Sequence, residues 1–224
     1  MIVYKYLNSQ SFLQVSFIKG LSFIFTMTDN KTLVPAEDYL TAGVHIGTKY
    51  KNGYSEKYIQ KARADGLKII DTEIIDAKLK VLINFLSKYE PSDFVIMGRR
   101  ENAKKPLQVF SKLVGCDVFT GRYLPGKLTN AALDDFKEYK VVIVCDPLTD
   151  KNILNEAYET GTFTVGFCDT NNKTNKLDLV VPINNKGKKS LGLALMLLAK
   201  HYLANKGILK ESDFKYTIED FADE

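Results

Sequence analysis

Short apolar runs rich in β-branched residues alternate with segments of helical spacing along most of this chain, and this alternation limits the folds it can adopt. The strand-like runs cover residues 67–71, 94–98, 116–119, 140–146, 164–168 and 177–182. Helical spacing covers 34–42, 74–86, 105–114 and 153–158, and it returns from 190 onward. Strands this short and this apolar, separated by helices, are typical of a mainly parallel sheet buried on both faces. A length of 224 residues fits one such domain.

The last helix is the most apolar, yet it follows the polar stretch NNKGKKS at 184–190. Leu191, Leu195, Leu198 and Tyr202 recur with helical spacing and other apolar residues lie between them, so we expect this helix to be covered on most sides. The start of a helix offers unbonded N–H groups and a positive dipole end, and three lysines lie nearby. The sequence therefore predicts an anion site, such as a phosphate site, at this position.

Charge is unevenly distributed along the chain. The formal net charge is +4, but residues 211–224 hold six acidic side chains and one basic one. Without that segment, 30 basic and 21 acidic side chains give the first 210 residues a charge of +9. A basic body with an acidic tail favours a polyanionic partner, and a mixed-charge solvated surface is the alternative.

Metal, disulfide and membrane chemistry find little support. Cys116, Cys145 and Cys168 lie far apart beside apolar runs, as buried thiols do in a reducing cytoplasm, and His45 and His201 are the only histidines. No cofactor or metal is therefore expected. The first 26 residues contain no run approaching the roughly 18 apolar residues of a spanning helix and fit a signal peptide poorly. No membrane association is expected.

We interpret residues 1–26 as an over-extended gene start before Met27, with a hydrophobic extension as the alternative. The remaining chain is expected to contain an N-terminal helix and basic arm at 27–65, an α/β core at 66–207 and an acidic tail at 208–224.

Catalytic motifs fail on inspection. The segment before Ser190 lacks the spacing of a P-loop, and no G-x-G-x-x-G follows the first strand. His201 lies within the apolar helix, and His45 between glycines is best explained as structural. Asp146 and Asp169 follow strands, where a carboxylate is either catalytic or accepts backbone N–H bonds at a turn. No catalytic residue and no small-molecule substrate are predicted.

Nucleic-acid binding is better supported, because the loops expected after the strands carry mainly donors. Parallel strands place these loops at one edge, and phosphates are bound by such mixtures of cations and amides. Tyr54 and Tyr58 among the lysines are four residues apart, which favours packing over base stacking. The predicted RNA-binding residues are Lys49, Lys51, Arg63, Arg99, Arg100, Lys104, Lys105, Arg122, Lys127, Asn185, Lys186, Lys188 and Lys189.

Six collinear segments make the chain recognisable. LVPAEDYLTAGVHIGT, KARADGLKIID, TGRYLPGKLTN, VIVCDP, GFCDTNN and VVPINNKGKKSLGLALMLLAKHYL resemble, in this order and spacing, the small-subunit ribosomal protein S-two family in its archaeal form. That family includes the eukaryotic laminin-receptor precursor. The resemblance extends from about Leu33 to Gly207. The long coiled-coil insertion of bacterial members is missing, and so is most of the acidic tail of eukaryotic members.

The resemblance implies a three-layer, doubly wound, single-domain α/β fold with a mostly parallel five-stranded sheet. It also implies a cytoplasmic protein on the solvent side of the small ribosomal subunit, near the head–body junction, with small-subunit rRNA and neighbouring ribosomal proteins as partners. Two departures matter. Leu148 replaces the arginine of the family's D-P-R, which removes one cation, and Ala131 stands where the family has Pro or Gln.

Two alternatives remain open at this point. One is a cytosolic α/β enzyme that binds a nucleotide or phosphosugar at the start of the helix after Gly187. The other is an adhesion or scaffold role like that of eukaryotic relatives, for which the sequence offers no separate support.

Overall fold

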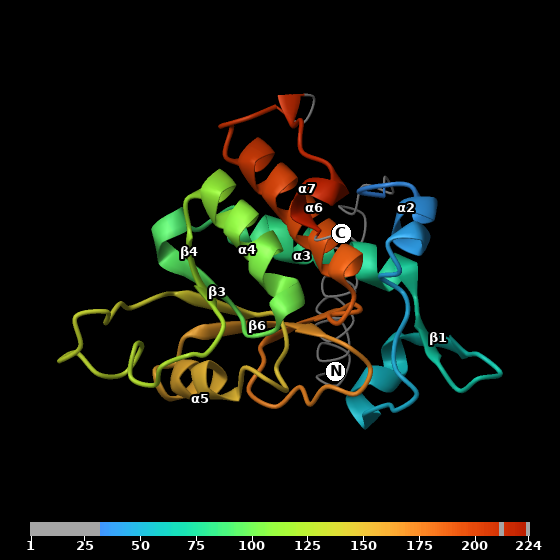
Figure 1. Cartoon of the computed structure of the whole chain (residues 1–224), viewed down its shortest axis with the longest axis horizontal. Helices are drawn as coiled ribbons and strands as arrows, with labels where there is room; N and C mark the ends of the chain where they lie inside the picture. Colours follow the sequence, from blue (N-terminus) through green and yellow to red (C-terminus); the bar gives the residue numbers. More distant parts are fainter. Residues whose placement is uncertain (1–31, 211–212, 223–224) are drawn as a thin grey trace, which may run out of the picture. The chain divides into compact units, whose positions relative to one another are not determined.

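The computed structural model of the chain describes residues 32–210 and 213–222 (Figure 1). The chain divides into two units, Met1–Thr32 and Leu33–Glu224. The described residues, apart from Thr32, belong to the second unit, so the segment 1–26 discussed above lies outside them.

The centre of the second unit is a five-stranded sheet in which every neighbouring pair is parallel. Its order is β4-β3-β5-β6-β7. Side chains of β3, β5 and most of β6 and β7 are buried, as in a sheet covered on both faces, whereas the edge strand β4 is half-buried. The predicted parallel sheet is thus confirmed, with no antiparallel member. Its strands are β3 (Phe94–Gly98), β4 (Asp117–Thr120), β5 (Val141–Val144), β6 (Phe163–Cys168) and β7 (Leu179–Pro182).

Helices lie on both faces of this sheet, which gives the predicted three layers. Figure 1 shows α3 (Thr72–Leu86), α4 (Glu101–Val114) and α6 (Lys188–Asn205) on one side and α5 (Lys151–Glu159) on the other. Because side chains alternate along a strand, β3 contributes Phe94 and Ile96 to one apolar core, and Val95 and Met97 to the other.

The last long helix, α6, is buried on nearly all sides, as its sequence predicts. Leu191, Leu195, Leu198 and Tyr202 have no exposed surface, and each buried leucine contributes about 1.5–3 kcal/mol. The chain returns after α6 and packs the short helix α7 (Ile218–Phe221) onto it. The ring of Phe221 is fully buried there, so this short helix of the tail packs on the core.

The strand expected at 67–71 forms as β2 (Lys68–Ile70), but it is not part of the parallel sheet. It pairs antiparallel with β1 (Ile59–Ala62) in a separate two-stranded sheet. Only five residues separate the two strands, too few for a parallel crossover of a dozen or more but enough for a hairpin. The hairpin and the short elements α2 (Ala36–Thr41) and η2 (Gly53–Tyr58) precede the core.

The helix expected at 105–114 begins earlier, at Glu101. Lys104, expected before the helix, and Lys105, expected as its first residue, therefore both lie within its first two turns. Proline usually marks a helix start because it lacks an N–H, but Pro106 lies inside α4. Asn102 tethers the start of α4, because its amide donates to the carbonyls of Asn185 and Lys186 at 3.2 and 3.0 Å.

Candidate nucleic-acid interface

The parallel sheet brings five polar loops to one edge. The strands end at Gly98, Thr120, Val144, Cys168 and Pro182, and because all of them run the same way, the following loops share the carboxyl edge. The segments after β3 and β7 are bonded to each other there, although the bonded residues, Asn102 and Lys186, are 84 positions apart in sequence. Most of the predicted cations lie on these loops or on the helices that follow them.

Two buried aspartates lie at the middle of this edge and neutralise two of the predicted cations. Arg100 donates to Asp146 at 2.6 Å, and the ammonium of Lys186 lies 2.9 Å from Asp169. Both aspartates are 2% exposed. Each also accepts a backbone N–H at its own turn, from Leu148 and from Thr170 respectively. The structural explanation given above for these aspartates therefore accounts for both.

An asparagine links the two ion pairs. Asn172 is buried, donates to Asp146 at 2.6 Å, and accepts the backbone N–H of Asp169 at 3.0 Å. Removing one partner from such a buried, hydrogen-bonded pair leaves an uncompensated charge, so Arg100 and Lys186 stabilise this edge. About a third of each of these two basic side chains remains exposed.

The polar stretch before α6 is only partly a surface. Asn185 and Ser190 are buried, and Asn185 donates to the carbonyl of Phe167 at 2.9 Å. The side-chain oxygen of Asn184 accepts hydrogen bonds from the backbone N–H groups of Lys186 and Gly187, and these bonds stabilise the turn before α6. The side chain of Asn185 is thus beyond the reach of RNA, while Lys188 and Lys189 at the start of α6 are exposed.

The loop after β4 is held by one buried carboxylate. Glu156 of α5 accepts the hydroxyl of Tyr123 at 2.9 Å and the backbone N–H groups of Gly126 and Leu128 at 2.7 and 3.3 Å. These bonds fix residues 123–128 although they contain no helix or strand. Arg122 and Lys127 are carried on this loop, and Lys127 lies 3.1 Å from the exposed Asp135.

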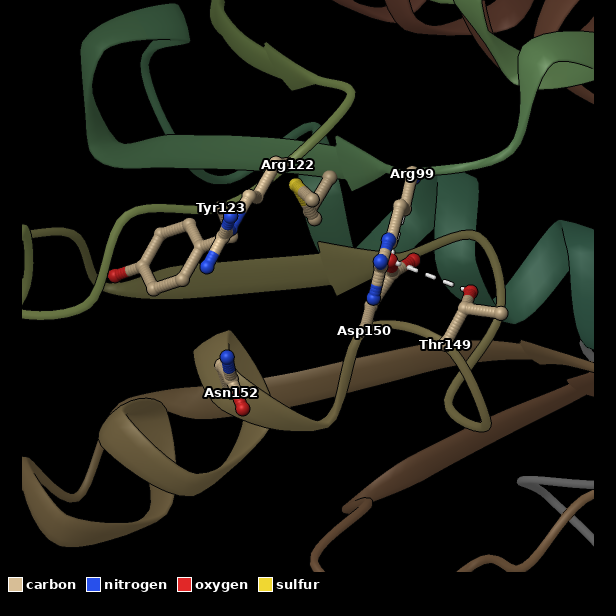
Figure 2. Close-up of a pocket in the computed structure, with 7 residues that line it drawn as sticks. Arg99, Arg122, Tyr123, Thr149, Asp150 and Asn152 are labelled. Carbon is tan, nitrogen blue, oxygen red and sulfur yellow. Dashed lines mark hydrogen bonds between the residues drawn. The ribbon is translucent and has the colours of Figure 1, made fainter.

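A polar cavity lies where β3 and β5 end. Its volume is about 380 Å³, and its lining residues come from β3, from the loops after β3, β4 and β5, and from the first turn of α5 (Figure 2). Arg99 and Arg122 extend into it from the ends of β3 and β4. Among the residues that the structure describes, neither guanidinium forms an ion pair. The other lining residues are Met97, Tyr123, Thr149, Asp150 and Asn152.

Asp150, at the floor of this cavity, is an unusual carboxyl group. It accepts the backbone N–H groups of Arg99 and Asp146 at 3.2 and 3.3 Å. Burial, reinforced by the nearby charge of Asp146, raises the pKa of Asp150 to about 7. This carboxyl is thus partly protonated near neutral pH, which limits its repulsion of an anion.

The cations of the N-terminal arm are exposed. Thr48 is anchored to Thr170, after β6, by a bond of 3.0 Å, which brings Lys49 to the carboxyl edge. Lys51 pairs with the exposed Glu56, and Arg63 lies 3.7 Å from the exposed Asp65. Exposed pairs of this kind contribute little to stability because solvent screens them, so a phosphate can replace the carboxylate.

The tyrosines of this arm differ in how far they are buried. Tyr58 is 6% exposed and belongs to the main core, as expected. Tyr54 packs edge to face on it at 5.9 Å and is partly exposed, with the ammonium of Lys57 3.7 Å from its ring centroid. Tyr50 is the most exposed of the three.

Two lysines of α4 have partners within the protein. Lys104 lies 3.6 Å from the exposed Glu101. Lys105 donates to the carbonyl of Ala222 at 2.7 Å and so fastens the C-terminal segment to α4. The contact of Lys105 with Ala222 requires the C-terminal segment to return over α4, and no local sequence pattern predicts this return.

Sequence reasoning missed the residues that organise this edge. Glu156, Asn172 and Asn184 are polar groups whose partners lie elsewhere in the chain. A signal existed for Glu156, since it follows Ile153 by three residues and precedes Ala157, on the inner face of α5. Nothing comparable marks Asn172 or Asn184.

Three further predictions concern cysteines, metals and membranes. Cys116, Cys145 and Cys168 are buried free thiols, as expected, and burial raises the pKa of the Cys116 thiol to about 12. Within residues 32–210 and 213–222, no three His, Cys, Asp or Glu side chains gather as metal ligands would. Over the same ranges, no helix combines the length and hydropathy of a membrane span.

Fold and site together define an α/β protein with a doubly wound parallel sheet and a basic carboxyl edge. A family model described as ribosomal protein S2 matches residues 39–134 and 133–204. Small ribosomal subunit protein uS2 of Thermoplasma acidophilum is 43% identical over 194 residues, which cover 86% of this chain and 98% of that protein. The proteins of that name from Nanoarchaeum equitans and Methanoregula boonei are each 42% identical, over 85% and 83% of this chain and 95% and 93% of theirs.

This chain therefore belongs to the ribosomal protein S2 family, in its archaeal form. The resemblance found in the six sequence segments is confirmed. Members of this family are structural proteins of the ribosome, so the enzyme considered as an alternative is set aside.

Proposed function

We propose that this protein is a cytoplasmic component of the small ribosomal subunit that binds small-subunit rRNA with the carboxyl edge of its sheet. The proposal rests on one observation. Four of the predicted cations are exposed at or beside this edge and form no ion pair with a described residue, which leaves their charge available to phosphates. They are Lys49, Arg99, Arg122 and Lys189.

Other predicted cations contribute to different degrees. Lys51, Arg63, Lys104 and Lys127 pair with carboxylates that are largely exposed, and these pairs are weak enough to exchange for phosphate contacts. Lys188, exposed at the start of α6, is also proposed to contact RNA. Arg100, Lys105 and Lys186 hold the protein together and reach RNA only with their exposed parts. We leave Asn185 out because it is buried.

The position on the ribosome is part of this proposal and rests on family resemblance. We place the protein on the solvent side of the small subunit near the head–body junction, beside neighbouring ribosomal proteins. Relatives that match this chain over nearly their full length are named as small-subunit proteins, which supports the assignment to that subunit.

Sedimentation of cell lysate tests the proposal. The wild-type protein should sediment with the small subunit at low salt and be released at high salt, because phosphate contacts are screened. A Lys49→Ala, Lys189→Ala double variant should bind isolated subunits about tenfold more weakly or worse.

The matched control is Lys88→Ala with Lys112→Ala. Both lysines are exposed and follow or end helices at the opposite edge of the sheet, so this variant should bind as the wild type does. A wild-type protein that stays at the top of the gradient at both salt concentrations would refute the proposal.

A further inference from the structure

The cavity between the ends of β3 and β5 occupies the place where ligands bind in sheets of this topology. The chain runs outward from β3 to β4 on one side and then crosses to β5 on the other. The loops after β3 and β5 therefore diverge, and this divergence leaves a crevice beyond the carboxyl ends of the two strands. The cavity of about 380 Å³ lies in that crevice (Figure 2).

We propose that this cavity binds one nucleotide unit through its phosphate. Arg99 and Arg122 reach into the cavity from separate loops, and no described carboxylate pairs with either guanidinium. Guanidinium groups offer planar, forked donors that match a phosphate, and two of them can hold different oxygens. Asn152 and Thr149 add amide and hydroxyl groups to the lining.

The size of the cavity favours a nucleotide over inorganic phosphate. At roughly 30 Å³ for each water molecule, the cavity has room for about a dozen waters, and this is far more than one phosphate needs. It also falls at the lower end of the roughly 300–1,000 Å³ typical of small-molecule sites. Tyr123 and Met97 complete the lining, and because both side chains are buried they fix the shape of the cavity.

The site is rigid where it needs to be. The hydroxyl of Tyr123 is bonded to Glu156, which fixes its ring. The backbone N–H of Arg99 is bonded to Asp150, which fixes the chain at the end of β3. The two arginine side chains stay exposed and adjustable, so the cavity combines a preformed floor with movable donors.

The nucleotide can belong to an RNA chain or be free in solution. Both sources offer the same phosphate, sugar and base, and only the RNA source rests on the proposed ribosomal function. Calorimetric titration of the purified full chain distinguishes them, with a nucleoside 5′-monophosphate, a short single-stranded oligoribonucleotide and inorganic phosphate as the three probes. Tighter binding of the oligoribonucleotide assigns the site to RNA, and tighter binding of the monophosphate assigns it to a free nucleotide.

Arg99→Gln with Arg122→Gln tests the two arginines directly. Each substitution removes charge-assisted bonds from an exposed side chain and leaves the backbone bond at Arg99 intact, so affinity should fall tenfold or more without a change in melting temperature. Arg99→Lys with Arg122→Lys keeps the charge but loses the forked geometry, so its affinity should lie between that of the wild type and that of the glutamine variant. Lys88→Gln with Lys112→Gln, equal in charge change but distant, should bind as the wild type does.

Three results would overturn the site: no binding of either nucleotide probe, unchanged affinity in the Arg99→Gln, Arg122→Gln variant, or inorganic phosphate binding as tightly as the nucleotides. Failure of the ribosomal proposal is a separate result, because it would appear as wild-type protein that does not sediment with the small subunit.

Discussion

At the scale of single residues, the basic side chains of the carboxyl edge have two different tasks. Lys186 neutralises the buried Asp169, whereas Lys189, three residues later, is exposed on the first turn of α6. Sequence alone cannot separate them, because the aspartate that binds Lys186 lies 17 residues earlier in the chain. Both lysines belong to one basic stretch, but only their partners reveal which one is structural.

Lys186→Ala should lower the free energy of unfolding by about 1–3 kcal/mol, since it leaves the carboxylate of Asp169 buried without its cation. The estimate is reduced from that of a fully buried pair because a third of the Lys186 side chain is exposed. Lys189→Ala should change stability by less than about 0.5 kcal/mol. Urea unfolding of both variants measures the difference, and equal stabilities would show that the ion pair contributes nothing.

Asp150 predicts a pH dependence. Its pKa is about 7 in the folded protein, raised by burial, and about 3.9 in an unfolded chain. Between these values the folded state holds a proton that the unfolded state has lost, so this group's contribution to stability falls as pH rises from about 4 to 7. Asp150→Asn stays neutral, and its stability relative to the wild type should increase by about 1–3 kcal/mol between pH 5 and pH 8.

Thermal and urea unfolding at both pH values check this prediction. Asp134→Asn, at an exposed position, is the control and should show no such change. A constant difference between Asp150→Asn and the wild type from pH 5 to pH 8 would mean that Asp150 titrates normally.

At the scale of elements, the sequence predicts the regular structure and misses what joins it. The strands at 94–98 and 164–168 and the helix before Leu86 form as expected, because their apolar patterns are local. The sequence pattern predicts that the strand at 67–71 belongs to the strand–helix alternation of the sheet. Its actual partner, the strand at Ile59–Ala62, is mostly exposed and has no apolar alternation that would reveal it. The helix α4 likewise begins earlier than its pattern predicts, because a proline such as Pro106 usually lies near a helix start and here lies inside the helix.

The loop after β4 is held in place by one side chain, Glu156, although it contains no helix or strand. Glu156→Gln keeps the size of the side chain but replaces one acceptor oxygen by an amide NH2 group, a donor that faces the donors of Tyr123, Gly126 and Leu128. Stability should fall by about 2–3 kcal/mol, and the amides of Gly126 and Leu128 should exchange faster with solvent.

Hydrogen exchange of the variant and the wild type measures this effect. Glu159→Gln, on the same helix but exposed, should leave both stability and exchange unchanged. Unaltered protection of the loop in Glu156→Gln would show that this carboxylate does not organise it.

At the scale of the whole molecule, a parallel sheet places the carboxyl ends of five strands at one edge. The basic side chains on the loops after these strands are therefore gathered at that edge. Sequence analysis could place cations on those loops because strand direction fixes the edge. It could not tell which cations the protein itself neutralises, since Arg100 meets Asp146 across 46 residues. It also could not foresee the cavity, whose arginines come from the ends of different strands.

Salt dependence of binding tests the central claim, that exposed cations of this edge bind small-subunit rRNA, most directly. The dissociation constant of the wild-type protein for small subunits depleted of it would be measured from low to high salt. If about six cations contact phosphates, the logarithm of affinity should fall with the logarithm of salt concentration at a slope of roughly −4 to −5. A flat response would contradict binding through phosphates and would point to contacts with neighbouring proteins instead.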